Sequence, residues 1–485
     1  MTSAPLIVWI RRDLRLADHA ALSFAASQGP VIPVFIHDDV TEGLGAAAQW
    51  RFGEGIARYA RTLTDHGSRL ILRRGRAVDV LQALLAETGA CGVVWQRAYD
   101  PASVARDTAV KSMLHEGGLI GQSFAGHLLF EPWSVETKTG GFYRVYTPFW
   151  RAVAQRSPEA LLPSPTLTAP EQWPESDDLG DWRMGRALDR GALVLERHAC
   201  VGEAAALDRL DRFVQEAMHG YKTERNAPAK PATSRLSENL TYGEISPARA
   251  WAAGQAGMST GVAGAEHFCK ELVWRDFAYH LMWHTPEILT RNWRPEWDGF
   301  SWSEDADDPA LLRWQQGRTG YPFVDAALRE MYVTGTMHNR GRMIVASFLT
   351  KHLLLHWRFG RDWFADCLTD WDPASNAMGW QWTAGCGPDA APYFRIFNPT
   401  SQLDKFDPGH SYPARWIAEG TLTPHADGLS FFDAVPRNWE LSQNVPYPSP
   451  QIELAAGRAR ALKAYATRPA AVKRDETLGT ALTTD

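Results

Sequence analysis

Several signatures of common protein classes are missing from this chain of 485 residues. Its five cysteines include no C-x-x-C pair, which argues against a zinc site and a disulfide framework and fits a reducing compartment. The apolar run at residues 5–10 is too short for a signal sequence, and no stretch approaches membrane-spanning length. We therefore expect a soluble cytoplasmic protein with two or three domains, no membrane partner and no metal site.

Positive net charge and nucleotide-binding glycines are also missing. The net charge is −6, which does not indicate a nucleic-acid-binding protein, although a local basic groove can lie on an acidic protein. The first apolar segment is followed by Arg11-Arg12-Asp13, where a Rossmann dinucleotide site would have G-x-G-x-x-G. We therefore do not expect a dinucleotide to bind there in the usual Rossmann manner.

What the first 130 residues do contain is an alternation of short apolar segments and helical periodicity. The strand-like segments are residues 6–10, 31–36, 70–72 and 92–95, and the helical ones are 46–66, 77–87 and 103–116. This alternation predicts a parallel sheet with helices on both faces, an α/β fold of Rossmann-like type.

The rest of the chain changes in character twice. Residues 131–200 are irregular and rich in proline, serine and threonine, which indicates a linker. Residues 201–470 read as helical, and 471–485 as a flexible tail. We therefore predict an α/β domain over residues 1–130, a long linker, and an all-α domain over residues 201–470.

The helical half is rich in tryptophan, with 14 of the 21 tryptophans after residue 250. The densest segment, residues 370–382, combines two acids, an amide and near-adjacent indoles, with no nucleophile beside a base, so it does not indicate hydrolysis. It suits a site that binds an aromatic cofactor and moves electrons through neighbouring rings. A tryptophan-rich helical core is the alternative that this segment alone leaves open.

Two further patterns place polar and aromatic groups together on helices. Glu271, Trp274 and Arg275 share one helix face by their spacing, which suits a wall that binds a nucleobase. An ordinary ion pair beside a core tryptophan explains them equally simply. Asn339 and Arg342 also share a face and suit the edge of a base or a flavin, although a structural role is equally open.

Hydroxyl groups cluster at residues 233–237, just before a helical stretch. Such a turn suits phosphate binding at a helix N-terminus, and simple helix capping is the alternative.

With these residues in hand, the chain resembles the photolyase/cryptochrome family, and most closely its class I cyclobutane pyrimidine dimer photolyases, over residues 5–465. The motifs that carry the resemblance are Trp9-Ile-Arg-Arg-Asp-Leu-Arg15, Thr233-Ser-Arg-Leu-Ser237, Trp314-Gln-Gln-Gly-Arg-Thr-Gly-Tyr-Pro322, Met337-His-Asn-Arg340, Gly379-Trp-Gln-Trp382 and Arg395-Ile-Phe-Asn-Pro399. It implies an N-terminal domain with an antenna chromophore and a helical domain with FAD beneath a DNA-binding face.

The resemblance also implies site residues. FAD contacts are matched by Tyr221, Thr233, Ser234, Arg235, Leu236, Ser237, Asn339, Arg342, Asp370, Trp371, Asp372 and Asn376, the last facing flavin N5. DNA contacts are matched by Arg225, Glu271, Trp274, Arg275, Asn339, Arg340, Met343, Trp382 and Gln402. The electron relay is matched by Trp380, Trp357 and Trp302, in order from the flavin outward.

The activity implied is light-driven repair of pyrimidine dimers in DNA by a monomer. The dimer is flipped out of the duplex, excited reduced anionic FAD donates an electron, and the cyclobutane ring splits. A protonated Glu271 is the hypothesised hydrogen-bond donor to the dimer. The competing function is a cryptochrome-type blue-light receptor; Asn376, which is neutral, and Asn339, where six-four photolyases need a histidine, favour repair of cyclobutane dimers.

Three positions depart from the family pattern. His19 replaces a usual asparagine, and Asp276 replaces a usual glutamate after Trp-Arg. Ala102-Ser103 stands where folate-binding relatives carry Asn-Glu. A folate antenna is therefore doubtful, and a deazaflavin, another flavin or an empty site stay open.

Overall fold

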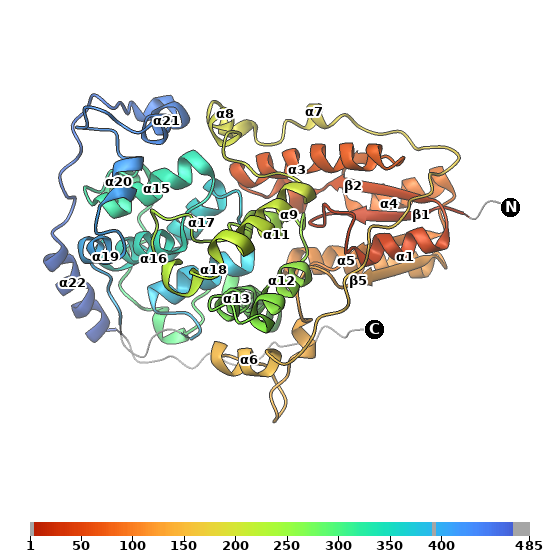
Figure 1. Ribbon diagram of the computed structural model, residues 1–485, viewed down its shortest axis with the longest axis horizontal. Helices are drawn as coiled ribbons and strands as arrows, with labels where there is room; N and C mark the ends of the chain where they lie inside the picture. The colour runs from red at the N-terminus through yellow and green to blue at the C-terminus, as the bar shows by residue number, and fades with distance from the viewer. Residues whose placement is uncertain (1–3, 390–393, 469–485) are drawn as a thin grey trace.

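The computed structural model describes residues 4–389 and 394–468. Figure 1 shows two parts side by side: a parallel sheet with its helices, and a larger, almost entirely helical part. The predicted fold class, an α/β part followed by a helical part, is confirmed.

The sheet is five-stranded and parallel, in the order β3-β2-β1-β4-β5. Its strands are β1 (Leu6–Ile10), β2 (Val31–His37), β3 (Ile71–Arg74), β4 (Gly92–Gln96) and β5 (Ile120–Phe124). In the register of the central strand, Leu6 lies opposite Val31 and Ile7 opposite Val93. The four predicted strands are therefore confirmed, whereas β5 was not predicted, because it is a half-exposed edge strand with few apolar residues.

Alternate side chains of β1 point to opposite faces of the sheet. Leu6 and Val8 pack on one face with the helices α1 (Ala20–Gln28) and α3 (Ala46–Asp65). Ile7 and Trp9 pack on the other face with α4 (Ala77–Thr88) and α5 (Pro101–Glu116). The short α2 (Asp39–Glu42) follows β2. Both faces are buried, as expected for a parallel sheet.

The remaining helices follow in chain order. They are α6 (Tyr146–Val153), α7 (Leu179–Trp182), α8 (Gly191–Leu195), α9 (Glu203–Arg212), α10 (Tyr221–Glu224), α11 (Ser237–Thr241), α12 (Pro247–Ser259), α13 (Ala265–His284), α14 (Pro309–Gln315), α15 (Pro322–Thr334), α16 (Asn339–Ser347), α17 (Trp357–Cys367), α18 (Pro373–Ala384), α19 (Pro399–Phe406), α20 (Ser411–Trp416), α21 (Ala426–Ala434) and α22 (Leu454–Ala466). Single 3-10 or π turns are η1 (Pro132–Ser134), η2 (Arg186–Leu188), η3 (Phe213–Ala217), η4 (Pro286–Leu289), η5 (Pro295–Trp297), η6 (Phe348–His352) and η7 (Arg437–Trp439). In the described residues, no helix is long and apolar enough to cross a membrane.

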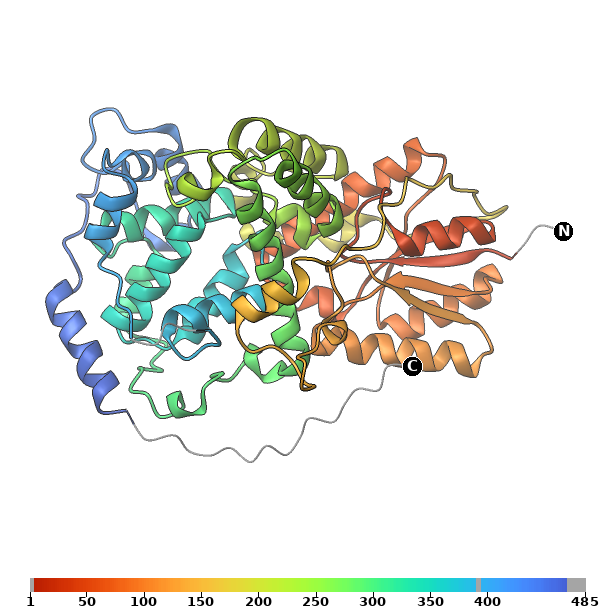
Figure 2. The ribbon, with the colours of Figure 1, turned by 60° about the horizontal axis from the view of Figure 1, so that its bottom comes forward.

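The helical part has two apolar cores. One is built mainly on α12 and α13, and the other on α14 to α17 with the C-terminal helices. Helix α18 belongs to both, because Ala374 packs into the first core and Trp380 into the second. The turned view of Figure 2 shows α13 between the sheet part and the other helices. Residues on α13 and α18 are therefore placed at the centre of the molecule.

Part of the segment expected as a surface linker is core. Helix α6 buries Tyr146, Phe149 and Val153 against α13, and α8 packs on α15 and α21. Between these helices the chain is irregular and runs over the surface past α7 (Figure 1). The prediction of a plain linker missed α6 because the aromatic residues that bury it lie between loop-like sequences.

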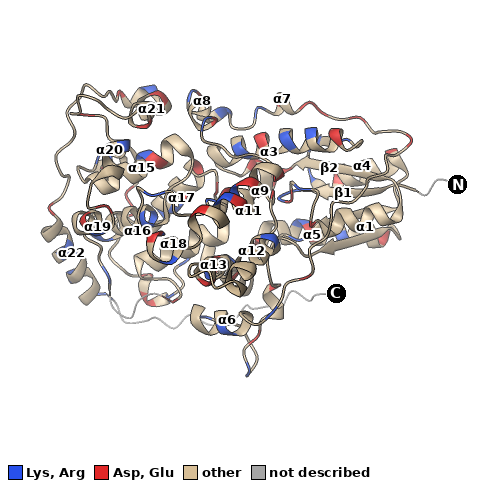
Figure 3. Ribbon diagram, in the orientation of Figure 1, with Lys and Arg blue, Asp and Glu red and all other residues tan. Residues whose placement is uncertain are grey.

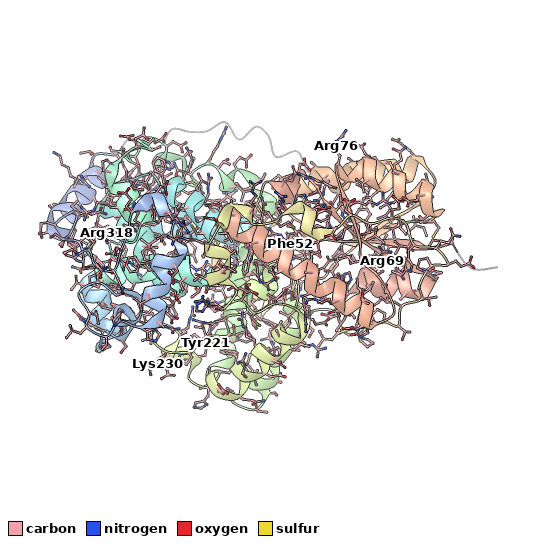
Figure 4. All side chains as sticks on the ribbon, turned by 90° about the horizontal axis from the view of Figure 1, so that it is seen from above. Phe52, Arg69, Arg76, Tyr221, Lys230 and Arg318 are labelled. Atoms are coloured by element: carbon pink, nitrogen blue, oxygen red, sulfur yellow. The ribbon has the colours of Figure 1, made fainter. Side chains whose placement is uncertain are left out.

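A buried ion cluster joins the two parts. Arg51 on α3 is fully buried and donates to Glu238, in the first turn of α11, and to Glu244, which follows that helix. In Figure 4 the label Phe52 marks α3, which lies obliquely against the helical part. Tyr221 is labelled within the helical part. Over the rest of the ribbon, acidic and basic residues are interspersed (Figure 3).

Candidate functional site

The start of α18 is built from the two acids that the sequence singled out. Asp372 caps the helix, because its Oδ1 accepts from the Ser375 N–H at 2.7 Å, and its Oδ2 accepts from the Tyr279 hydroxyl. Asp370 pairs with Arg342 on α16, whose Nη2 lies 2.7 and 2.9 Å from the two carboxylate oxygens. The ion pair and the cap hold α16, α13 and α18 in one arrangement.

One face of α18 is open. Asn376 and Gly379 are three residues apart and share it, and a Cβ at Gly379 would meet no atom of the described residues within 4 Å. The Asn376 amide donates to the Arg361 carbonyl at 3.0 Å, which sets the orientation of its side chain. Space beside a small residue, next to a fixed amide, fits a flat ring of a cofactor.

The hydroxyl-rich turn at residues 233–237 has a special backbone. Arg235 lies in the left-handed region, with φ 54°, and its carbonyl accepts from Arg209 at 2.7 Å. The next residue after the turn, Glu238, is the buried partner of Arg51. The turn is therefore held from behind by buried charges, while Thr233 and Ser234 are half-buried and Ser237 is exposed.

These residues fit FAD, whose implied contacts they match. Hydroxyl and backbone donors of the turn suit its phosphates, and the acids, the amide and the open face at Gly379 suit its ring system. Tyr221 is buried at the start of α10, edge-on to Phe213 and Phe268.

The other predicted surface lies at α10, α13 and α16. Arg225, which ends α10, forms an ion pair with Glu271 on α13. Arg340 on α16 donates to the neighbouring Asn226 at 2.6 Å and lies over Phe406. Burial first, and then the nearby cations Arg225 and Arg395, lowers the pKa of Arg340. Such a gathering of guanidinium groups attracts an anion, as a DNA-binding face must.

Trp274 on α13 rests on an aromatic residue that sequence reasoning missed. Its indole stacks on Tyr146 of α6, with ring centroids 3.6 Å apart and an angle of 6° between the planes. The Tyr146 hydroxyl donates to the Lys270 carbonyl at 2.7 Å. Trp274 therefore presents a braced ring, and the only signal for Tyr146 was its place in an aromatic stretch of the expected linker.

Arg275 is not placed as predicted. Its guanidinium donates to the His127 carbonyl at 2.6 Å and lies 2.8 Å from His127 Nε2, on the side of α13 that faces the sheet part. Adjacent residues on a helix point about 100° apart, so Arg275 turns away from Trp274. In this structure Arg275 joins the two parts through His127, and its DNA contact stays a prediction.

Trp371 lies at the interdomain side of the helical part, and its predicted FAD contact stays a prediction. It lines a cavity of about 620 Å³ between the sheet part and the helical part, where Arg12 lies 5.7 Å over its ring. The cavity wall includes the ends of β1, β2 and β4, together with Asn376. Ala102 and Ser103, which replace the folate pair, also line it.

The remaining predicted contacts lie near the same surface. Asn339 is exposed at the start of α16, and Met343 is half-buried one turn later. Trp382 is half-buried and lines a small basic pocket with Lys351 and Arg395. Gln402 is half-buried on α19, and Leu236 is buried behind the hydroxyl turn.

The three relay tryptophans lie in one region, but within the described part of the chain their rings are not in direct contact with one another. Trp380 packs on α17 at Gly360, where a Cβ would come within 1.9 Å of the indole. Gly360 is one turn after Trp357 on α17. Trp357 and Trp302 are linked through His356, whose ring centroid is 5.6 and 5.2 Å from theirs. All three are buried.

Comparison with known families now gives the site a context. The family model for the FAD binding domain of DNA photolyase matches residues 268–467, and the model for DNA photolyase matches residues 6–171. The chain belongs to the DNA photolyase family. The predicted resemblance to the photolyase/cryptochrome family is thereby confirmed.

Individual relatives span nearly the whole chain. A deoxyribodipyrimidine photo-lyase of Agrobacterium fabrum is 46% identical over 96% of this chain and 98% of its own length. Cryptochrome-2 of Arabidopsis thaliana is 34% identical over 86% of this chain and 71% of its own length.

Solved structures agree with these relatives. A bacterial class III photolyase from Agrobacterium tumefaciens matches with a TM-score of 0.88 and 46% identity, over 96% of this chain and 98% of that one. An archaeal photolyase from Sulfolobus tokodaii that contains two FAD molecules matches with a TM-score of 0.77 and 28% identity, over 95% and 99%. The class I assignment that the resemblance implied is not supported by the first of these.

Proposed function

We propose that this protein is a deoxyribodipyrimidine photo-lyase that repairs cyclobutane pyrimidine dimers in DNA with blue light. The observation that carries the proposal is the surface at α10, α13 and α16, where the braced Trp274, the carboxyl group of Glu271 and two guanidinium groups converge. A receptor that only signals has no need for such a pocket. The photo-lyase relative at 46% identity supports the predicted enzyme class, and by the same relationship we place the chain in class III rather than class I.

The residues divide the work as follows. Reduced FAD, when bound and excited, supplies the electron that splits the dimer. The turn at residues 233–237, Tyr221 and the pair Arg342–Asp370 would hold the cofactor, and Asn376, which carries no ionisable group, would lie beside its ring. Trp274 stacks on the flipped dimer while Arg340 holds a flanking phosphate.

Glu271 acts next to the dimer. Burial raises the pKa of its carboxyl group, and Arg225 opposes that rise. In its protonated form Glu271 donates a hydrogen bond to a carbonyl of the dimer. Trp380, Trp357 and Trp302 carry electrons inward when FAD needs to be reduced, which is a separate task from repair.

The interdomain cavity supports a second proposal, that it binds a flat antenna chromophore. The buried Gln96 Nε2 and the Trp371 Nε1, both in residues that line the cavity, have no hydrogen-bond partner among residues 4–389 and 394–468. Donors of this kind suit carbonyl groups of a heteroaromatic ring. With Ala102 and Ser103 in place of the folate pair, a flavin or deazaflavin is favoured over a folate.

The domain division predicted above, residues 1–130, 131–200, 201–470 and a tail at 471–485, remains our proposal, as do the monomeric state and the cytoplasmic location. The tail lies outside the described residues.

The decisive experiment is repair of an oligonucleotide that carries one thymine dimer, with reduced protein, in blue light and in the dark. Light-dependent restoration of thymine is the expected result. Glu271→Ala should lower the repair yield, whereas Glu266→Ala, at an exposed position on the same helix, should not. Photoreducible FAD with no repair would favour the cryptochrome-type receptor.

The antenna proposal has its own test. Chromophores released by denaturation are identified by mass spectrometry, which separates flavin, deazaflavin, folate and none. Gln96→Leu should lose the antenna and keep FAD; retention of the antenna in this variant would contradict the site.

A further inference from the structure

Arg225 has a position between two possible partners. It ends α10, its guanidinium pairs with Glu271, and it also lies 5.4 Å over the Tyr221 ring. The side chains of Arg225 and Glu271 are 20% and 31% exposed. Both therefore reach the surface where DNA would bind, and a phosphate can compete for the guanidinium.

Glu271 depends on this one cation. The neighbours that face it from other elements are Arg225 and Tyr221 of α10 and Tyr146 of α6. On its own helix, Lys270 is paired with Glu266 at 2.9 Å, and Arg275 is bonded to His127. In the part of the chain that the structure describes, Arg225 is thus the one cation recorded in an ion pair with Glu271.

A DNA phosphate is a stronger partner for this guanidinium. Arginine binds phosphate through two parallel hydrogen bonds, and Arg225 is close enough to Arg340 to be one of the causes that lower the pKa of Arg340, after burial. A phosphate placed between Arg225 and Arg340 can accept hydrogen bonds from both guanidinium groups, whereas the recorded ion pair of Glu271 is with Arg225 alone.

On the basis of the proposed function, we propose that Arg225 exchanges Glu271 for a backbone phosphate when damaged DNA binds, and that Glu271 then takes up a proton from solvent. A carboxylate that loses its only counter-ion in a pocket covered by the dimer is held in its neutral form. The neutral form is also the one that can donate a hydrogen bond to the dimer. Binding would thereby produce the donor that repair needs, and Arg225 is a positioning residue for it.

Proton uptake on binding is directly measurable. Calorimetric titration of the FAD-loaded protein with dimer-containing oligonucleotide, in the dark and in PIPES and Tris buffers, gives the number of protons taken up from the buffer dependence of the heat. We expect uptake of up to about one proton per complex in the wild type. The Glu271→Gln variant should take up fewer protons than the wild type, by that same amount. The matched Glu266→Gln variant should take up as many protons as the wild type.

Arg225→Met separates the exchange from simple burial by the dimer. Without the cation, Glu271 is already closer to its neutral form before DNA binds, so proton uptake should fall although Glu271 is present. An unchanged uptake in Arg225→Met, or an equal uptake in Glu271→Gln and wild type, would overturn the inference. FAD content and melting temperature verify that each variant is folded.

The outcome is separable from the proposed function. If the wild-type protein repairs DNA in light but takes up no proton on binding, the proposed photo-lyase function is supported and the proposed exchange at Arg225 is refuted. Loss of both repair and dimer-specific binding would remove the proposed function itself, and the inference with it. As a second readout, affinity for damaged DNA should weaken as the pH rises in the wild type and stay flat in Glu271→Gln.

Discussion

The two sides of helix α13 are built in opposite ways. Toward the sheet part, Asp276 accepts two backbone N–H groups and Arg275 is held by the carbonyl of His127. Toward the proposed DNA face, Glu271 pairs with one cation, Arg225, and Trp274 stacks on Tyr146 with Phe277 at its edge. Groups with several fixed partners stabilise the fold, and groups with a single partner can exchange it for a ligand. Each variant below compares one side with the other.

The largest effect is expected at the inner side, in Asp276→Ala. The carboxylate oxygen Oδ2 accepts from the N–H groups of Leu129 and Phe130, both at 2.9 Å, and these donors would be left buried without a partner. We expect a loss of about 3 to 5 kcal/mol in stability, seen as a lower melting temperature. Glu266→Ala, at an exposed ion pair on the same helix, should change stability by less than about 1 kcal/mol. Equal losses in both variants would contradict the comparison.

The same residue gives a pH dependence of stability. Burial raises the pKa of Asp276 to about 7 in the folded protein, against 3.8 ordinarily. Between these values the folded state holds the proton and the unfolded chain has released it, so stability falls as the pH rises from about 4 to about 7, by roughly 2 to 4 kcal/mol. Asp276→Asn keeps an acceptor and cannot titrate.

Melting temperatures of the two proteins across this range measure the difference. The Asp276→Asn profile should be flatter than that of the wild type, and parallel profiles would show that Asp276 titrates normally.

At the outer side, Trp274→Ala should weaken binding rather than folding. Stacking of a base on an aromatic ring contributes about 1 to 3 kcal/mol, so affinity for dimer-containing DNA should fall roughly 5- to 150-fold. Trp283→Ala is the matched change, because Trp283 is on the same helix and packs on Trp133 at 5.0 Å. It should lower the melting temperature and leave affinity within about 2-fold. Fluorescence anisotropy measures the affinity of each variant for DNA. A similar loss of affinity in both variants would contradict the difference between the two sides of α13.

The smallest effect is expected from one phosphate contact. Arg340→Gln should reduce the slope of log affinity against log salt by about 1, equally for damaged and undamaged DNA. Arg76→Gln, at an exposed arginine of the sheet part (Figure 4), should leave the slope unchanged. A loss confined to damaged DNA would mean that Arg340 reads the lesion and not the backbone.

Prediction from sequence was most successful where a pattern is local. The alternation of apolar residues in 6–10 and 31–36 located β1 and β2, because strand and helix periods are properties of short segments. Helix starts are also set locally: Asp372 caps α18 and Pro373 is its first residue. The edge strand β5 was missed because half of its residues face solvent.

Prediction was weakest where a side chain could turn to either of two partners. Spacing put Glu271, Trp274 and Arg275 on one face, yet a rotation of about 100° between neighbours was enough to give Arg275 to the sheet part. Trp371 likewise went to the interdomain cavity while Asp370 and Asp372 stayed with α16 and α13. Neither outcome follows from helix periodicity. Each depends on which residues of the sheet part lie next to the helix.

By itself the sequence determined the fold class, the order of the elements and the identity of the family, since these depend on short periodic patterns and on motifs that are contiguous in the chain. Only the tertiary structure decided that Tyr146 braces Trp274, that Arg225 holds Glu271 and that a cavity separates the two parts. The physical reason is that these contacts join segments far apart in the chain, and the packing of the two cores sets their distances.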